Sequence, residues 1–170
     1  DFSFGGLTDR AIVRAGLRGA GVPDDAAAVD RVIERYLGLL PALVEASPGY
    51  RVLPGVMELL ARLEGRSMLA LGLGTGNVRP GAYAKLSRAG LAERFRFGGF
   101  GCDDEDQAAL CAAGVRRGAG ELWVSPVECR VVIVGDTPRD IAAAHAIGAE
   151  CVAVATGEHP EAALGAAGGG

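Results

Sequence analysis

Three short apolar runs, set apart by stretches with helical character, constrain the fold more than any other feature of this sequence. They cover residues 67–73, 131–134 and 151–155. Runs of this length are typical of buried strands, and strands that alternate with helices form parallel sheets. The first run leads into the turn 72–77 and the second into the turn 135–140. Because open α/β sheets bind ligands at the carboxyl ends of their strands, we expect these two turns to face one crevice.

The sequence before residue 48 predicts helices. Thr8 or Asp9 can cap a first helix, and Pro23 and Asp24 open a second one. The apolar residues of the second helix recur at three- and four-residue spacing and form one stripe: Val29, Val32, Ile33, Tyr36, Leu37, Leu40, Leu43 and Val44. The pattern stops at residues 47–50, and a third helix is expected from Val56 through Leu63.

Composition and charge exclude several classes of function. The chain has 170 residues and a net charge of -4, with no block of basic residues, which argues against a nucleic-acid partner. No apolar run approaches the length of about 20 residues that a membrane span needs, and the first residues lack a signal pattern. We therefore expect a cytoplasmic protein without a membrane partner. Its four cysteines are spaced too widely for a zinc or redox signature, which indicates reduced structural thiols.

Two aspartates follow the second apolar run. Asp136 comes directly after the predicted strand, and Asp140 lies near the start of the next helix, after Pro138. Two carboxylates at a strand end form a hard oxygen site suited to Mg²⁺, which keeps several waters and takes one or two protein carboxylates. The alternative is that Asp140 caps the helix and Asp136 forms a turn.

The glycine-rich turn after the first run predicts an anion site. Gly72, Gly74 and Gly76 would let backbone N–H groups approach an anion, while Thr75 and Asn77 add side-chain donors for phosphoryl oxygens. The turn lacks the ending of a P-loop and the spacing of a dinucleotide fingerprint.

Lys85 is the only lysine of the chain and follows this turn by one helical stretch. A compact ammonium there could neutralise a phosphate and a nearby carboxylate. The alternative is an exposed lysine on a helix.

These motifs, in this order, resemble those of haloacid dehalogenase-like phosphatases, and most closely the phosphoglycolate phosphatase-like branch. The segments that carry the resemblance are residues 71–77, Lys85-Leu86, Gly90-Leu91, residues 97–101 and residues 134–140. The resemblance implies a Rossmann-like parallel-sheet core over residues 49–170 with a helical cap domain over residues 1–48. It also implies a Mg²⁺-dependent phosphoric monoester hydrolase that acts on a small phosphorylated metabolite through an aspartyl-phosphate.

The resemblance also assigns roles to residues. Thr75 would bond to the transferring phosphoryl group, with Gly76 and Asn77 beside it in the substrate-binding turn. Lys85 would steady the nucleophile and the phosphate charge. Asp136 would hold Mg²⁺, and Asp140 would support that site or share the metal; these two and Thr75 and Lys85 form the predicted catalytic set. Phosphoryl transfer depends on such positioning and charge neutralisation.

One motif of the family has no counterpart here. The two aspartates at the end of the first core strand, which supply the nucleophile, are absent, and the acidic run 103–106 follows the third motif and more simply starts a helix. We therefore expect a core without its first strand, a sheet that is either gapped or closed by direct pairing, and no turnover by the chain alone. The competing hypotheses are a truncated non-catalytic relative that binds phosphate or a partner, and a relative that cleaves a different bond.

Overall fold

The computed structural model describes residues 6–170 and shows an α/β protein. Its helices are α1 (Asp9–Gly19), α2 (Ala26–Ala46), α3 (Val56–Leu63), α4 (Arg79–Ser87), α5 (Gln107–Leu122), α6 (Pro138–Ala146) and α7 (Glu161–Ala166). Its strands are β1 (Leu73–Thr75), β2 (Gly98–Phe100), β3 (Val132–Gly135) and β4 (Glu150–Ala153). Helices and short parallel strands alternate from β1 onward, and α1, α2 and α3 precede them. The predicted fold class, a Rossmann-like core with an N-terminal helical part, is confirmed.

The strands form two separate parallel ladders. β1 pairs with β2, with Leu73 opposite Gly98, and β3 pairs with β4, with Val132 opposite Glu150. Within residues 6–170, β1 and β3 are not paired with each other, so the sheet is interrupted between them. Of the two arrangements that the sequence predicted, the gapped sheet is the one observed.

The first apolar run was expected to be a strand over residues 67–73, and this prediction is wrong except at its last residue. β1 begins at Leu73, because a ladder exists only where a partner strand exists and β2 offers three residues. Met68 instead has a positive φ of 59° and is 71% exposed, so the chain turns there. The other two runs form β3, one residue later than its run, and β4, which begins one residue earlier and ends two residues earlier than its run.

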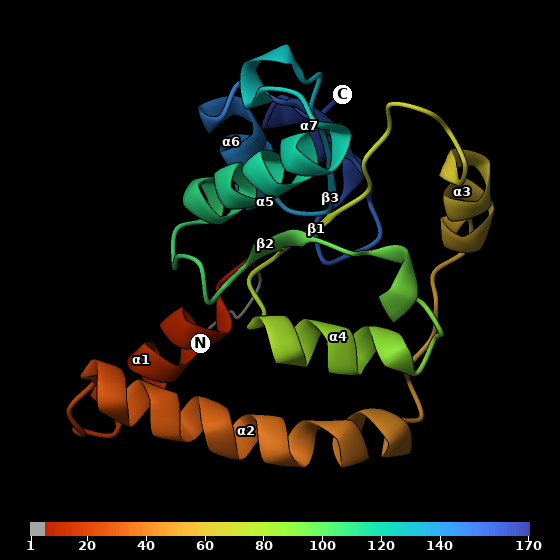
Figure 1. Cartoon of the computed structure of the whole chain (residues 1–170). Coiled ribbons are helices and arrows are strands. Elements are labelled where there is room, and N and C mark those ends of the chain that lie inside the picture. The colour runs from red at the N-terminus through yellow and green to blue at the C-terminus, as the bar shows by residue number, and fades with distance from the viewer. Residues whose placement is uncertain (1–5) are drawn as a thin grey trace.

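Helix α5 joins the two ladders. It lies across one face of β1 and β2 and also packs against α6, which contacts both β3 and β4 (Figure 1). The approach to β2 is close: a Cβ built on Gly99 would lie 1.8 Å from the carbonyl oxygen of Leu110. On the other side, Leu110 and Cys111 form a buried cluster with Ala143 of α6. A single helix therefore links two halves of the core that, within residues 6–170, share no strand pairing.

α2 packs beneath α4, and α1 packs against α2 (Figure 1). Thr8 caps α1, as predicted, by accepting a hydrogen bond from the N–H of Ala11 at 3.2 Å. α2 begins at Ala26, two residues later than expected, because Asp25 is its N-cap and accepts from the N–H of Ala28. α3 spans the predicted residues. Among the described residues, no helix combines the length and apolar character that crossing a membrane requires.

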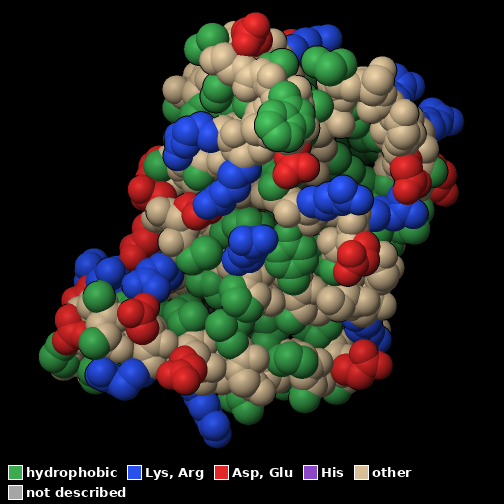
Figure 2. Space-filling model, viewed as in Figure 1, with side chains coloured by type: hydrophobic (Ala, Val, Ile, Leu, Met, Phe, Trp, Pro, Cys, Tyr) green, Lys and Arg blue, Asp and Glu red, His purple; other side chains and the backbone are tan. Residues whose placement is uncertain are grey.

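Only part of the apolar stripe of α2 is buried. The residues Val29, Ile33, Leu40 and Val44 face the rest of the protein, whereas Val32 and Leu43 are 39% and 62% exposed. The predicted apolar stripe is therefore only partly covered, since α1 and α4 pack against one side of the helix. Figure 2 shows apolar side chains gathered over α2 and α4, and charged side chains of both signs around α1.

Candidate functional site

The predicted site residues lie in or beside two loops, and each loop follows a strand of a different ladder. The first runs from β1 into α4 and the second from β3 into α6. Both ladders are parallel, so each loop lies at the carboxyl end of its strand, where α/β sheets place ligands.

Thr75 and Asn77 form the first loop. The hydroxyl oxygen of Thr75, the last residue of β1, accepts a hydrogen bond from the N–H of Asn77 at 3.2 Å. A hydroxyl both donates and accepts, so its proton remains to be given to another acceptor. The carbonyl oxygen of Asn77 accepts from the N–H of Gly101 at 2.9 Å, which ties the loop to the end of β2.

The prediction that three glycines form an anion-binding turn is wrong for Gly72 and Gly74. Gly72 precedes β1 and Gly74 lies within it, so neither residue is in the turn. A Cβ on Gly72 would come within 2.4 Å of the Phe97 ring, which shows that this glycine serves close packing. Gly76 alone remains in the loop, where a Cβ would lie 2.6 Å from the carbonyl oxygen of Leu7. The start of α1 therefore presses on the loop directly.

Lys85 reaches back from α4 to this loop. Its Nζ donates to Oδ1 of Asn77 at 3.1 Å, and its own carbonyl oxygen accepts from the hydroxyl of Tyr50 at 2.6 Å. The residue is half-buried. The alternative of an exposed, unengaged lysine is therefore wrong, and the ammonium group lies beside the Thr75–Asn77 loop as predicted.

Asp136 is the first residue after β3 and is half-buried. Within residues 6–170 its carboxylate has no hydrogen-bond or ion-pair partner. Its Oδ2 lies against Gly157, where an added Cβ would come within 2.4 Å. The carboxylate thus has room on that side only because residue 157 is glycine.

Asp140 has both carboxylate oxygens engaged. Oδ2 accepts from the N–H and the hydroxyl of Thr137 at 3.0 and 2.8 Å, and the Thr137 hydroxyl oxygen in turn accepts from the N–H of Asp140. This is a capping box at the start of α6. Oδ1 accepts from the Gln107 side chain at 3.2 Å. The alternative role of Asp140, capping its helix, is the one that the structure shows.

The acidic run 103–106 serves structure, as expected. Asp106 caps α5 by accepting from the N–H of Ala109 at 2.8 Å. Asp103 makes two bonds with Arg117, at 2.6 and 2.7 Å, and this guanidinium lowers the pKa of Asp103.

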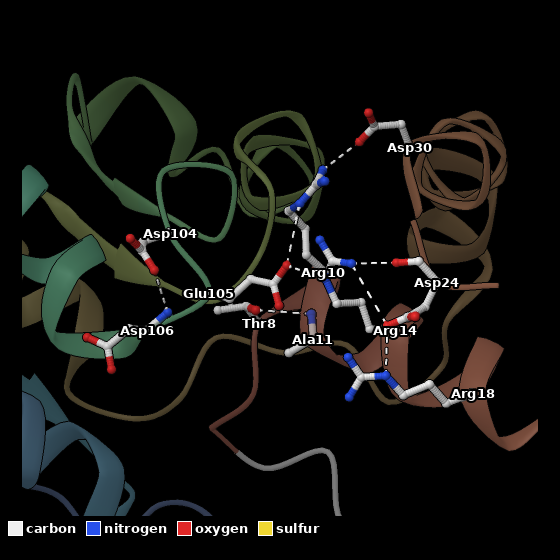
Figure 3. Close-up of polar contacts among 10 residues, drawn as sticks. All are labelled: Thr8, Arg10, Ala11, Arg14, Arg18, Asp24, Asp30, Asp104, Glu105 and Asp106. Carbon is white, nitrogen blue, oxygen red and sulfur yellow. Dashed lines mark hydrogen bonds and ion pairs between the residues drawn. The ribbon is translucent and has the colours of Figure 1, made fainter. Parts of the chain in front are cut away.

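Glu105 connects the end of β2 with the α1–α2 pair. It accepts from Nε of Arg14 at 2.7 Å, and Arg10 lies 3.9 Å away (Figure 3). Arg10 also pairs with Asp30, and Arg14 donates to the carbonyl oxygen of Asp24 (Figure 3). Arg10 and Arg14 therefore lie between Glu105 on one side and Asp30 and the carbonyl oxygen of Asp24 on the other.

All four cysteines are free thiols, and Cys111 of α5 is buried. Burial raises the pKa of the Cys111 thiol to about 11, and the charges of Asp140 and Asp106 act in the same direction. The thiol is neutral at physiological pH. Among residues 6–170, no three His, Cys, Asp or Glu side chains are grouped to hold a metal ion.

The structure joins Thr75, Asn77 and Lys85 by hydrogen bonds and sets Asp136 beside the capping box of Asp140 on the other loop. Sequence reasoning missed Asp9. Its carboxylate accepts from the Asn77 side chain at 3.0 Å and from the N–H of Val78 at 2.8 Å, a contact between segments so far apart in the chain that no local pattern indicates it.

Two comparisons bear on this geometry. A family model described as HAD-hydrolase-like matches residues 111–169. The chain is also similar to the phosphoglycolate phosphatase of Synechococcus elongatus, with 34% identity over 163 residues. That alignment covers 94% of this chain and 68% of the relative.

Proposed function

The chain belongs to the haloacid dehalogenase-like hydrolases, in their phosphoglycolate phosphatase-like branch, and from this premise we propose that it hydrolyses the phosphate ester of a small metabolite with the help of Mg²⁺. The observation that carries the proposal is the linked group of Thr75, Asn77 and Lys85 at one strand end, with Asp136 at another. A phosphoryl group needs donors and a cation on one side and a metal-binding carboxylate on the other.

Each residue has a distinct role in the proposed reaction. The free proton of the Thr75 hydroxyl donates to a phosphoryl oxygen, beside Gly76 and Asn77 in the substrate-binding turn. The ammonium of Lys85 offsets the negative charge of the phosphate and of the attacking carboxylate. These groups stabilise charge that develops at phosphorus, which is the main demand of phosphoryl transfer.

The nucleophile is assigned to none of residues 6–170. A carboxylate oxygen must attack phosphorus, and a carboxylic acid must give its proton to the departing ester oxygen. The gap between β1 and β3 is the place we propose for them, on an additional strand that bears two aspartates. Such a strand would pair with both free edges and lie between Lys85 and Asp136.

The residues present fit a magnesium ion that keeps most of its waters. Asp136 would hold the ion directly, because its carboxylate has no other partner within residues 6–170. Asp140 has both oxygens engaged and holds the loop in place. The buried Oε1 of Gln107 has no partner in the described part of the chain, and the Nε2 of the same side chain donates to Asp140. When bound, Mg²⁺ neutralises charge on the phosphoryl oxygens.

Calorimetric titration with MgCl₂ tests the metal site without requiring turnover. We expect Asp136→Asn to abolish the binding heat and Asp104→Asn, an exposed acidic control, to leave it unchanged. In a form of the protein that has turnover, Asp136→Asn should also abolish Mg²⁺-dependent hydrolysis of a generic phosphate ester. Equal Mg²⁺ binding by the wild type and Asp136→Asn would refute the assignment.

A second candidate function is phosphate binding without catalysis, which the interrupted sheet favours. It uses the same residues of the first loop and predicts that the 170-residue chain binds inorganic phosphate but hydrolyses no ester. Adding a strand with two aspartates distinguishes the two candidates. Turnover that appears with the added strand supports the phosphatase, and binding without turnover in both forms supports the second candidate.

A further inference from the structure

Asp9 occupies an unusual place for the first residue of a helix. It does not cap α1, since Thr8 does so, and its carboxylate points to the loop after β1 instead. Oδ1 accepts from the side-chain Nδ2 of Asn77 at 3.0 Å and Oδ2 from the N–H of Val78 at 2.8 Å. Its own N–H donates to the carbonyl oxygen of Gly76 at 2.8 Å. These hydrogen bonds thus bind one residue of α1 to consecutive residues of the loop.

The partners of Asn77 determine which way its amide points. A carboxylate only accepts hydrogen bonds and an ammonium only donates them. Asn77 must therefore turn its NH₂ group to Asp9 and its oxygen to Lys85, whose Nζ lies 3.1 Å from Oδ1. The reverse orientation would bring two donors together at Lys85 and two acceptors together at Asp9.

The carboxylate of Asp9 also provides a hydrogen-bond acceptor at the start of α4. The N-cap residue of this helix, Val78, has no capping hydrogen bond from its own side chain, and the carboxylate of Asp9 accepts its N–H. A negative charge at a helix start is favourable because it complements the helix dipole. Lys85 lies in the last turn of the same helix, so Asp9 acts on it through the Asn77 amide and through the start of its helix.

We infer that Asp9 is a positioning residue that fixes the Asn77 amide and thereby sets the place of the Lys85 ammonium. Asp9 makes no contact with Lys85 and is not assigned a contact with substrate. It couples the first helix of the chain to the charged group that the proposed reaction uses. The inference deepens the proposed function, and its effect on turnover rests on that function.

The single lysine makes a direct test possible. The ¹H–¹⁵N signal of a lysine ammonium is observable when hydrogen bonding slows its exchange, and here such a signal can come only from Lys85. Asp9→Asn places an amide where a carboxylate stood, so one donor of Asn77 or Val78 meets another donor. We expect the Lys85 signal to shift or broaden. Asp30→Asn makes the same chemical change in an exposed ion pair of α2 and should leave the signal unchanged.

A reciprocal exchange separates positioning from general damage. In the double variant Asp9→Asn with Asn77→Asp, the amide now at position 9 donates to one oxygen of the carboxylate now at position 77. The second oxygen of that carboxylate accepts from Lys85. This exchange restores the match of donors and acceptors, so the Lys85 signal should return in the double variant. The same result is expected even if Asp9→Asn alone does not fold. Failure of the signal to return, or a wild-type signal in Asp9→Asn, overturns the inference.

A form of the protein with turnover provides the second readout. Asp9→Asn should lower kcat by about 10- to 100-fold, as expected for a residue that orients a catalytic group, with little change in KM. Absence of hydrolysis in every variant, wild type included, would count against the proposed function, whereas the Lys85 signal would still decide the positioning role. Unchanged kcat in a variant with a displaced Lys85 signal would overturn the coupling to turnover.

Discussion

The loop after β1 and the loop after β3 lie at equivalent ends of their strands, but different parts of the chain hold them. Asp9 of α1, Lys85 of α4 and Gly101 after β2 all bond to the first loop. Thr137 and Asp140, three residues apart, hold the second loop within its own helix start, and Gln107 bonds to it from another helix. One loop is therefore held by distant residues and the other mainly by itself.

The difference separates two ways of building a site. A loop held by local capping keeps its shape whenever its own helix is folded. The position of its carboxylates therefore depends little on the rest of the protein. A loop held from a distance takes its shape only when α1, α4 and β2 are all in place. The position of Lys85 should therefore depend on the packing of the α1–α2 pair, whereas that of Asp136 should not.

The largest expected effect tests whether Lys85, beside the loop after β1, takes part in catalysis. In a form of the protein with turnover, Lys85→Ala should lower kcat by about 10²- to 10³-fold, because a charge that stabilises the transition state is lost. Lys85→Arg should retain more activity but not all, since a planar guanidinium presents its charge differently. Arg35→Ala, at a site of α2 away from the loop, is the control. Wild-type kcat for Lys85→Ala would return this residue to a structural role.

The next effect concerns the loop that holds itself. Asp140→Ala removes the capping box and should lower the free energy of unfolding by about 1 kcal/mol, measured by urea denaturation. Thr137→Ala should cost a similar amount, and the double variant should cost less than the sum, because the two residues share one interaction. Strict additivity would contradict a local origin of this loop's shape.

A smaller effect depends on pH and lies in the half of the core that contains β2. Arg117 lowers the pKa of Asp103 below its ordinary value of 3.8, so the folded state binds this proton less readily than the unfolded state. The stability that the pair contributes is complete above that value and is lost as pH falls below it. Urea midpoints measured through this range should fall less steeply for Asp103→Asn. If the urea midpoint fell equally steeply with pH in the wild type and in Asp103→Asn, the ionisation of Asp103 would not contribute to the loss of stability in acid.

The smallest effect is expected in the half that contains β4. Glu150 and Arg130 make two bonds, at 2.7 and 2.8 Å, but their side chains are 57% and 79% exposed. Solvent screens such pairs and side-chain entropy offsets them. Glu150→Gln should leave the urea midpoint unchanged at neutral pH. A clear decrease would mean that the β3–β4 ladder depends on its surface charges more than the β1–β2 ladder does.

The parts that the sequence predicted well are those that local chemistry determines. The strand before Asp136 follows from a buried apolar run, and Pro138, expected in a turn, is instead the first residue of α6, where its fixed φ fits. The cap at Thr8 follows from a hydroxyl before a helical pattern. The same reasoning gave both possible roles of Asp140; the observed bonds show the capping role, and its role toward a metal ion stays a prediction.

The parts that it missed depend on pairing across the chain. β1 could not be placed correctly from its apolar run, because its first residue is set by the length of β2. The contact between Asp9 and Asn77 joins residues whose separation leaves no trace in any local spacing. Gly72 was assigned to an anion site because nothing in its neighbourhood reveals the ring of Phe97.

The contact of α5 with both ladders has a consequence for how the molecule comes apart. A core divided into two unpaired ladders would ordinarily open in two steps, each with its own free energy. Because α5 is buried against β2 on one side and Ala143 on the other, neither ladder can open without exposing residues of the same helix. Hydrogen exchange of the central amides of α5 should therefore be the slowest in the protein. The two halves should unfold in one cooperative transition.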